Sequence, residues 1–132
     1  MAESNLILID TCIWIPFFNR PHSDEKRHVD HLLDENRAAI TGEVLYEILV
    51  GFRRNEQADW VASALFGVAL IEPTWDEWRA GARLGRELRA RGHSIPLTDV
   101  LLSAVALERG CAVYTIDPHF DLIPRLLKFH PE

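Results

Sequence analysis

The chain has 132 residues, of which 48% are hydrophobic and 26% are charged. This length and composition are typical of a globular protein, and we expect one domain over residues 1–132. The formal charge of −6 argues against a simple DNA- or RNA-binding module, because phosphate contacts require Lys and Arg. The charge does not exclude an enzyme that acts on phosphodiesters, since clustered carboxylates lower the net charge and a bound cation reverses their sign locally.

Nothing in the sequence predicts a membrane segment or export. The longest apolar run, residues 13–18, is far too short to span a bilayer. Residues 1–5 lack the basic and then apolar pattern of a secretory signal. Cys12 and Cys111 each lie beside an apolar segment, and we interpret them as buried free thiols in a reducing compartment. We therefore expect a cytoplasmic protein.

In chain order, short apolar runs alternate with helical patterns. The expected elements are a strand at 6–10, a helix at 11–18, a charge-rich, exposed and mobile helix within 22–36, a weak strand at 38–41, helices at 43–53 and 56–66, a strand at 68–71, a helix at 74–90, a core helix from Thr98 to Gly110, a strand at 112–117, a turn at 118–120 and an edge strand at 126–129. This alternation predicts an α/β fold with a parallel sheet and helices on both faces.

Polar side chains mark several ends of these elements. Thr98 is a suitable N-cap for the core helix, and Gly110 is a suitable C-terminal stop. His28 and His31 share one helix face with solvent-type residues, so we interpret them as a surface pair, with a zinc site as the alternative.

Four acidic residues occupy positions that the fold would bring together. Asp10 and Asp117 each end an apolar strand, and Asp99 lies at the start of the core helix. Glu47 lies closer than Glu43 to the apolar arc of its helix, so Glu47 is the inward candidate and Glu43 is expected to be solvated. Each acid alone has a structural explanation, because such residues also cap helices and begin turns.

Convergence of these acids at the carboxyl edge of the sheet would create a cation site. Open α/β folds bind ligands at that edge. Carboxylate oxygens suit Mg²⁺ or Mn²⁺ better than zinc or copper. Such ions promote phosphodiester hydrolysis by activating water and neutralising phosphate charge. The sequence therefore predicts a metal-dependent enzyme that acts on phosphoryl groups.

A basic stripe occurs away from the acidic residues. Arg79, Arg83 and Arg86 recur at i, i+4 and i+7, so they share one face of the expected helix. The stripe is either a solvated helix face, which we favour, or a surface for phosphate or for an acidic partner.

The chain resembles a PIN-domain ribonuclease, and most closely a VapC-type toxin of a toxin–antitoxin pair. Four stretches carry the resemblance in the family's order: 8–15 (LIDTCIWI), 40–51 (ITGEVLYEILVG), 95–104 (IPLTDVLLSA) and 113–120 (VYTIDPHF). The resemblance implies an α/β/α sandwich around a mostly parallel sheet. It assigns Asp10, Glu47, Asp99 and Asp117 as the catalytic and metal-binding set, and Thr115 as the hydroxyl position before the last acid.

The same resemblance implies the activity and the partners. Family members are typically Mg²⁺- or Mn²⁺-dependent endoribonucleases that form homodimers and are neutralised by a small VapB-like antitoxin. Ile116 departs from the family, which often has a polar residue before the last acid, but no candidate ligand is lost. The alternative is a PIN-like interaction module that has no catalytic activity.

Overall fold

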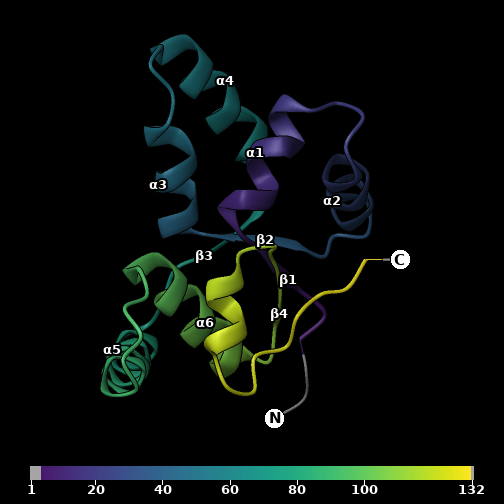
Figure 1. Cartoon of the computed structure of the whole chain (residues 1–132). Helices are drawn as coiled ribbons and strands as arrows, with labels where there is room; N and C mark the ends of the chain where they lie inside the picture. Colours follow the sequence, from purple (N-terminus) through teal and green to yellow (C-terminus); the bar gives the residue numbers. More distant parts are fainter. Residues whose placement is uncertain (1–3, 132) are drawn as a thin grey trace.

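The computed structural model describes residues 4–131 and has an α/β/α architecture (Figure 1). Its elements are β1 (Ile7–Ile9), α1 (Thr11–Asn19), α2 (Asp24–Asp34), β2 (Ala38–Thr41), α3 (Gly42–Val50), α4 (Asn55–Leu65), β3 (Ala69–Ile71), α5 (Trp75–Ala90), α6 (Leu97–Arg109), β4 (Ala112–Tyr114) and the 3₁₀ helix η1 (Pro118–Leu122). Helices α1 to α4 cover one face of the sheet, and α5, α6 and η1 cover the other. The predicted fold class is confirmed.

The sheet has four strands in the order β3-β2-β1-β4, and every pairing is parallel. The central strands β1 and β2 are almost fully buried, because helices lie on both of their faces. Parallel pairing brings the carboxyl ends of β1 and β4 side by side, with Ile9 in register with Tyr114. The residues that follow these two strands therefore meet at one edge of the sheet.

Several predicted ends of elements needed correction. β4 ends at Tyr114, three residues before Asp117, because the Asp117 carboxylate caps η1 instead of continuing the strand. The expected edge strand at 126–129 is reduced to one parallel bridge between Val113 and Lys128. Residues 1–3 of the amino-terminal stretch lie outside the described residues.

The helix caps are partly as predicted. The expected N-cap Thr98 lies inside α6, which begins one residue earlier after Pro96 and has no side-chain cap. Gly110 ends α6 with a φ of 65°, a left-handed conformation that favours glycine, as predicted. The start of α5 is well fixed, because Thr74 and Glu77 form a reciprocal capping box.

Helix α2 is less exposed than its sequence predicts. Val29 and Leu32 are completely buried, so these two apolar side chains attach the helix to the core. The interpretation of His28 as a surface residue is wrong, because His28 is half-buried and its Nδ1 atom lies 2.9 Å from the hydroxyl oxygen of Tyr114 at the end of β4. His31 instead lies 3.4 Å from Glu35 on an exposed face.

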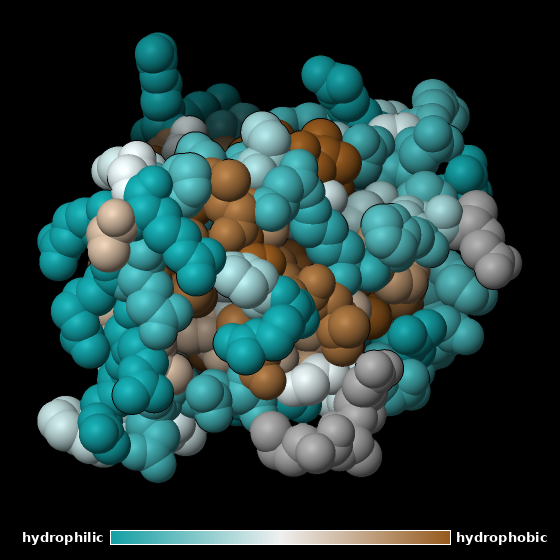
Figure 2. Space-filling view, turned by 60° about the horizontal axis from the view of Figure 1, so that its bottom comes forward, coloured by the Kyte–Doolittle hydropathy of each residue, from teal (hydrophilic) through white to brown (hydrophobic). Residues whose placement is uncertain are grey.

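The aromatic residues divide between the core and the surface. Trp14 is fully buried and its indole N–H donates to the carbonyl of Ile9, whereas Tyr46, Trp60 and Phe66 are exposed. Figure 2 shows apolar side chains gathered in the middle of the face that carries α5 and α6, with hydrophilic side chains around them. Within the described part of the chain, no helix is both long enough and apolar enough to cross a membrane.

Candidate active site

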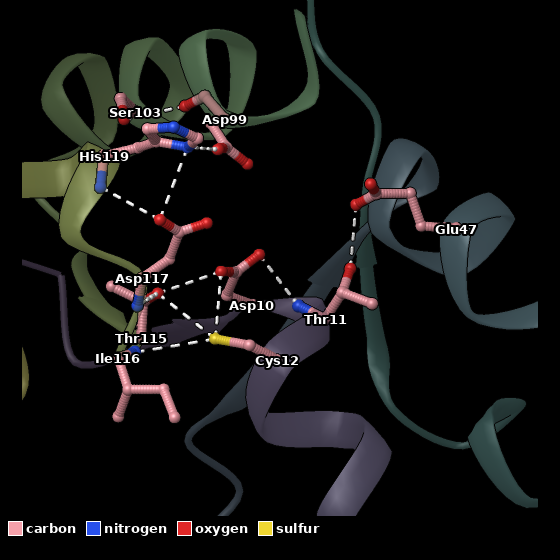
Figure 3. Close-up of polar contacts among 10 residues, drawn as sticks. All are labelled: Asp10, Thr11, Cys12, Glu47, Asp99, Ser103, Thr115, Ile116, Asp117 and His119. Carbon is pink, nitrogen blue, oxygen red and sulfur yellow. Dashed lines mark hydrogen bonds and ion pairs between the residues drawn. The ribbon is translucent and has the colours of Figure 1, made fainter. Parts of the chain in front are cut away.

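Asp99 and Asp117 approach each other at the carboxyl edge of the sheet, and His119 lies between them (Figure 3). One oxygen from each carboxylate and one imidazole nitrogen lie within 4.8 Å of one another. The His119 Nδ1 atom is 3.1 Å from Asp99 Oδ2 and 3.3 Å from Asp117 Oδ1. Asp99 is in the first turn of α6. Asp117 is the N-cap of η1, and His119 lies in the first turn of η1.

The loop after β4 has its shape because Asp117 is a capping residue. Its carboxylate accepts a 2.9 Å hydrogen bond from the backbone N–H of His119, and its own N–H donates to the Thr115 hydroxyl. This Asx-type turn points the Asp117 carboxylate and the His119 ring toward α6. Sequence reasoning assigned residues 118–120 only to a turn and missed His119. The available signal was a histidine two residues after the last acid.

Asp10 forms the next part of the site and is 3% exposed. It caps α1 by accepting a 2.8 Å hydrogen bond from the N–H of Thr11. Its Oδ2 atom accepts from the Thr115 hydroxyl at 2.9 Å and from the Cys12 thiol at 3.3 Å. The two strand ends are therefore joined through Asp10, and the Asp10 carboxylate is held in one orientation.

The Cys12 thiol orients the carboxylate and is not a nucleophile. Burial, and then the charge of Asp10, raise the pKa of Cys12 to about 11, so the thiol stays protonated at neutral pH. The sequence predicted a buried free thiol, and Cys12 is free and half-buried while Cys111 is fully buried. The direct contact between Cys12 and Asp10 was not predicted.

Glu47 lies across the site from Asp99, on α3. Among residues 4–131, the only close group of possible metal ligands is that of Asp99, Asp117 and His119, and Glu47 is not part of it. The Glu47 Oε1 atom instead accepts a 2.8 Å hydrogen bond from the Thr11 hydroxyl. Glu43 is only half-buried, yet its Oε2 atom is buried without a hydrogen-bond partner among the described residues. The expectation that Glu43 is solvated is therefore wrong for that oxygen.

The electrostatics of the site favour a cation. Burial, opposed by the contact with His119 and assisted by the charges of Asp10 and Asp117, raises the pKa of Asp99 to about 6. A carboxylate in this position is costly when charged unless a positive group neutralises it. The carboxylate oxygens of the site suit Mg²⁺ or Mn²⁺, whereas an imidazole nitrogen such as that of His119 is more typical of sites for zinc and other transition metals.

Comparison with known proteins shows which family the chain belongs to. The family model of the PIN domain matches residues 7–126. The chain belongs to the PIN domain family. VapC ribonuclease Mb1587 of Mycobacterium bovis is 29% identical over 125 residues, which cover 92% of this chain and 93% of that protein. Ribonuclease VapC11 of Mycobacterium tuberculosis is similar to the same extent.

Solved structures of toxin–antitoxin complexes share the fold of this PIN domain. VapBC2 from Rickettsia felis, bound to a promoter DNA fragment, has a TM-score of 0.81 at 21% identity and covers 94% of this chain and 97% of its own. DNA-bound VapBC from Salmonella typhimurium has a TM-score of 0.78 at 19% identity, with coverages of 94% and 96%. The resemblance to VapC-type PIN domains seen in the sequence motifs is therefore confirmed.

Proposed function

We propose that this PIN domain is a VapC-type endoribonuclease toxin that hydrolyses RNA phosphodiester bonds with a divalent cation. The observation that carries the proposal is the meeting of Asp99, Asp117 and His119 at the carboxyl edge of the sheet, next to the buried Asp10. The named VapC ribonucleases, which align over nearly the whole chain, support the same activity.

The proposed metal-binding residues are Asp10, Asp99, Asp117 and Glu47. Mg²⁺ or Mn²⁺, when bound, would supply charge neutralisation at the scissile phosphate and activation of water. Asp99 and Asp117 each offer a carboxylate oxygen within 4.8 Å of the other, and the Thr115 hydroxyl donates to the Asp10 carboxylate. Glu47 lies at the far side of the site, held by Thr11. The protein's contribution is to fix these oxygens before RNA arrives.

The decisive experiment compares RNA cleavage by the wild type and by Asp99→Asn with Mg²⁺ present. We expect cleavage by the wild type and a loss of at least about 100-fold in the variant, because a ligand of the cation is removed. Asp59→Asn, an exposed position on α4, is the matched control and should cleave normally. Equal rates in wild type and Asp99→Asn would favour the non-catalytic interaction module.

Expression in cells tests the toxin role separately. The wild type should arrest growth, whereas Asp10→Asn at equal protein abundance should not. Normal growth with well-folded, abundant wild-type protein would contradict a toxin even if RNA is cut in vitro. The similar structures are VapBC complexes, so we also propose a small VapB-like antitoxin as the partner whose co-expression restores growth.

A homodimer is the proposed assembly. The exposed apolar side chains of Tyr46 and Val50 on α3 and of Leu70 and Trp75 near the edge strand β3 offer surface for such a contact. Light scattering on the purified protein tests the assembly, and a monomer at micromolar concentration would contradict it.

A further inference from the structure

A groove of about 650 Å³ runs between α5 and the start of α6, outside the acidic site. Two glycine residues of α5, Gly81 and Gly85, lie at the bottom of the groove, where they leave no side chain between the two helices. At Gly81, an added Cβ would come within 3.3 Å of Leu101 Cδ1, and at Gly85 within 3.8 Å of Val100 Cγ1. The two helices therefore pack closely beneath the groove, and its walls are made by longer side chains.

The charge of the groove is opposite to that of the whole chain. Arg86, Arg89 and His93 line it, and no Asp or Glu is among its lining residues, although the chain carries a formal charge of −6. Within residues 4–131, neither Arg86 nor Arg89 forms an ion pair. Two guanidinium groups thus remain available to an anionic ligand.

The basic stripe expected from the sequence is divided by the structure. Arg79 pairs with Asp76 at 3.7 Å, and Arg83 lines a separate hollow that also contains Glu87 and Glu108. Arg86 alone of the three predicted residues lines the groove. The unpaired positive charge that could bind phosphate therefore lies on the side of α5 that carries Arg86, and not along the whole stripe.

An aromatic side chain stands at one end of the groove. Trp78 lines it and is 45% exposed, so one face of the indole is open to a ligand. Trp78 and Arg89 are eleven residues apart on α5, which is about 16 Å along the helix axis. At about 3.4 Å per stacked nucleotide, this length suits about four or five nucleotides.

The groove opens close to the acidic site. Leu97 lines the groove, and Asp99 follows two residues later in the first turn of α6, about 3 Å further along the axis. Asp99 does not itself line the groove, because residues two apart point to nearly opposite sides of a helix, so a chain leaving the groove would pass around the first turn of α6 to reach the Asp99 carboxylate.

We propose that this groove binds a single-stranded segment of the RNA substrate beside the cleavage site. Arg86 and Arg89 contact phosphates, and Trp78 stacks on a base, which is the common combination in single-strand binding. This inference rests on the proposed ribonuclease function. A second copy of the chain fits the groove less well, because a symmetric contact would bring the same unpaired cations together.

The test measures RNA binding in the Asp99→Asn background, so that bound RNA is not cut. The probe is a fluorescein-labelled single-stranded RNA of about 15 nucleotides, followed by anisotropy over a range of salt concentrations. Arg86→Gln with Arg89→Gln should weaken binding about tenfold and reduce the salt slope by about 1.4, or about 0.7 per phosphate contact. Arg79→Gln with Arg83→Gln removes the same charge from the same helix and should change binding less than about twofold.

The aromatic contact has its own matched pair. Trp78→Ala should weaken binding about tenfold, while Trp60→Ala, at an exposed tryptophan on α4 that does not line the groove, should not. Equal effects of the two double variants, or equal effects of the two tryptophan variants, would overturn the inference. The inference would also be overturned if a groove variant changed the oligomeric state in light scattering but not the RNA affinity. A second copy of the chain would then be the occupant of the groove.

Failure of this inference can be distinguished from failure of the proposed function. If the wild type cuts RNA and the groove variants bind RNA normally, only the groove assignment is wrong. If the wild type cuts none of a range of RNAs with Mg²⁺ or Mn²⁺, the ribonuclease proposal itself fails, and the RNA groove fails with it.

Discussion

The Thr11 hydroxyl donates a 2.8 Å hydrogen bond to Glu47 Oε1 and connects the first turn of α1 to the middle of α3. The two residues are 36 positions apart in sequence. Thr11 also donates its backbone N–H to Asp10, so one residue orients two of the proposed acidic ligands. A hydroxyl at position 11 therefore fixes the separation of Glu47 from the rest of the site.

Replacing Thr11 by Val should lower RNA cleavage by about 10- to 100-fold, as is usual when a group that orients a metal ligand is lost. Val keeps the shape and the backbone N–H but cannot donate to Glu47. Thr11→Ser is the control, since it retains the hydroxyl and should keep most of the activity. The measurement is the initial cleavage rate at several Mg²⁺ concentrations. Equal loss in both variants would show that the methyl group, and not the hydrogen bond, matters.

Asp99→Asn should stabilise the metal-free protein at neutral pH. The folded pKa of Asp99 is about 6 and its reference value is 3.8, so its stabilising contribution is present below pH 4 and is lost as the pH rises through 6. Removing the ionisable group should therefore raise Tm at pH 7.5 and have little effect near pH 4. Calorimetry in EDTA at both pH values measures this. A lower Tm at pH 7.5 would contradict the raised pKa.

Mg²⁺ should reverse the order of these stabilities. A free Mg²⁺ concentration of about 100 times the dissociation constant adds about 2.7 kcal/mol to the free energy of unfolding of the wild type. Asp99→Asn, which lacks one ligand, should gain much less at the same Mg²⁺ concentration. The difference between Tm with Mg²⁺ and Tm in EDTA is the quantity to compare, with Asp59→Asn as the exposed control. An equal gain in wild type and Asp99→Asn would place the cation elsewhere.

Much of this fold was predictable because its signals are local. The apolar run before Asp10, the glycine at position 110 and the apolar length of α6 each depend on a few neighbouring residues. The end of β4 was not predictable, because Asp117 can either follow a strand or cap a 3₁₀ turn, and only the contact with His119 and Thr115 decides between them.

The sequence predicted that the acids would lie near one another but not their detailed geometry. The four acids lie around one edge of the sheet, yet the tightest group contains His119 in place of Asp10 or Glu47. Long-range contacts such as that between Thr115 and Asp10, 105 residues apart, leave no pattern in one sequence. The direction of the Arg86 and Arg89 side chains likewise depends on how α5 packs on α6.

The pair of Glu77 and Arg109 should be a main support of α5 on α6. Glu77 is 5% exposed, and its two oxygens lie 2.6 and 2.8 Å from Arg109 nitrogens. Glu77→Gln should cost about 2 to 3 kcal/mol, less than the loss of a fully buried pair because Arg109 is partly exposed. Asp76→Asn, which breaks the exposed contact with Arg79, should cost less than about 1 kcal/mol.

This ion pair also predicts a pH dependence of stability. The Arg109 hydrogen bonds lower the pKa of Glu77 below its reference value of 4.5. The contribution is therefore complete at neutral pH and is lost as the pH falls below 4.5 through the depressed folded pKa. Urea unfolding between pH 7 and pH 3 should show a smaller loss of stability in Glu77→Gln than in the wild type. Parallel curves would contradict the shift.

His119→Ala should move cation binding to higher pH. The imidazole lies 3.1 Å from Asp99 Oδ2, and this contact lowers the pKa of Asp99 against the effects of burial and of the neighbouring acids. Without it, the pKa of Asp99 rises above about 6, and protons compete with the cation over a wider range. The pH at which Mn²⁺ binding is half-maximal, followed by electron paramagnetic resonance, should rise relative to the wild type. His22→Ala, at an exposed residue before α2, is the control. In His119→Asn, an amide N–H that donates to Asp99 should reverse part of this rise. An unchanged midpoint in His119→Ala would mean that His119 does not control the charge of Asp99.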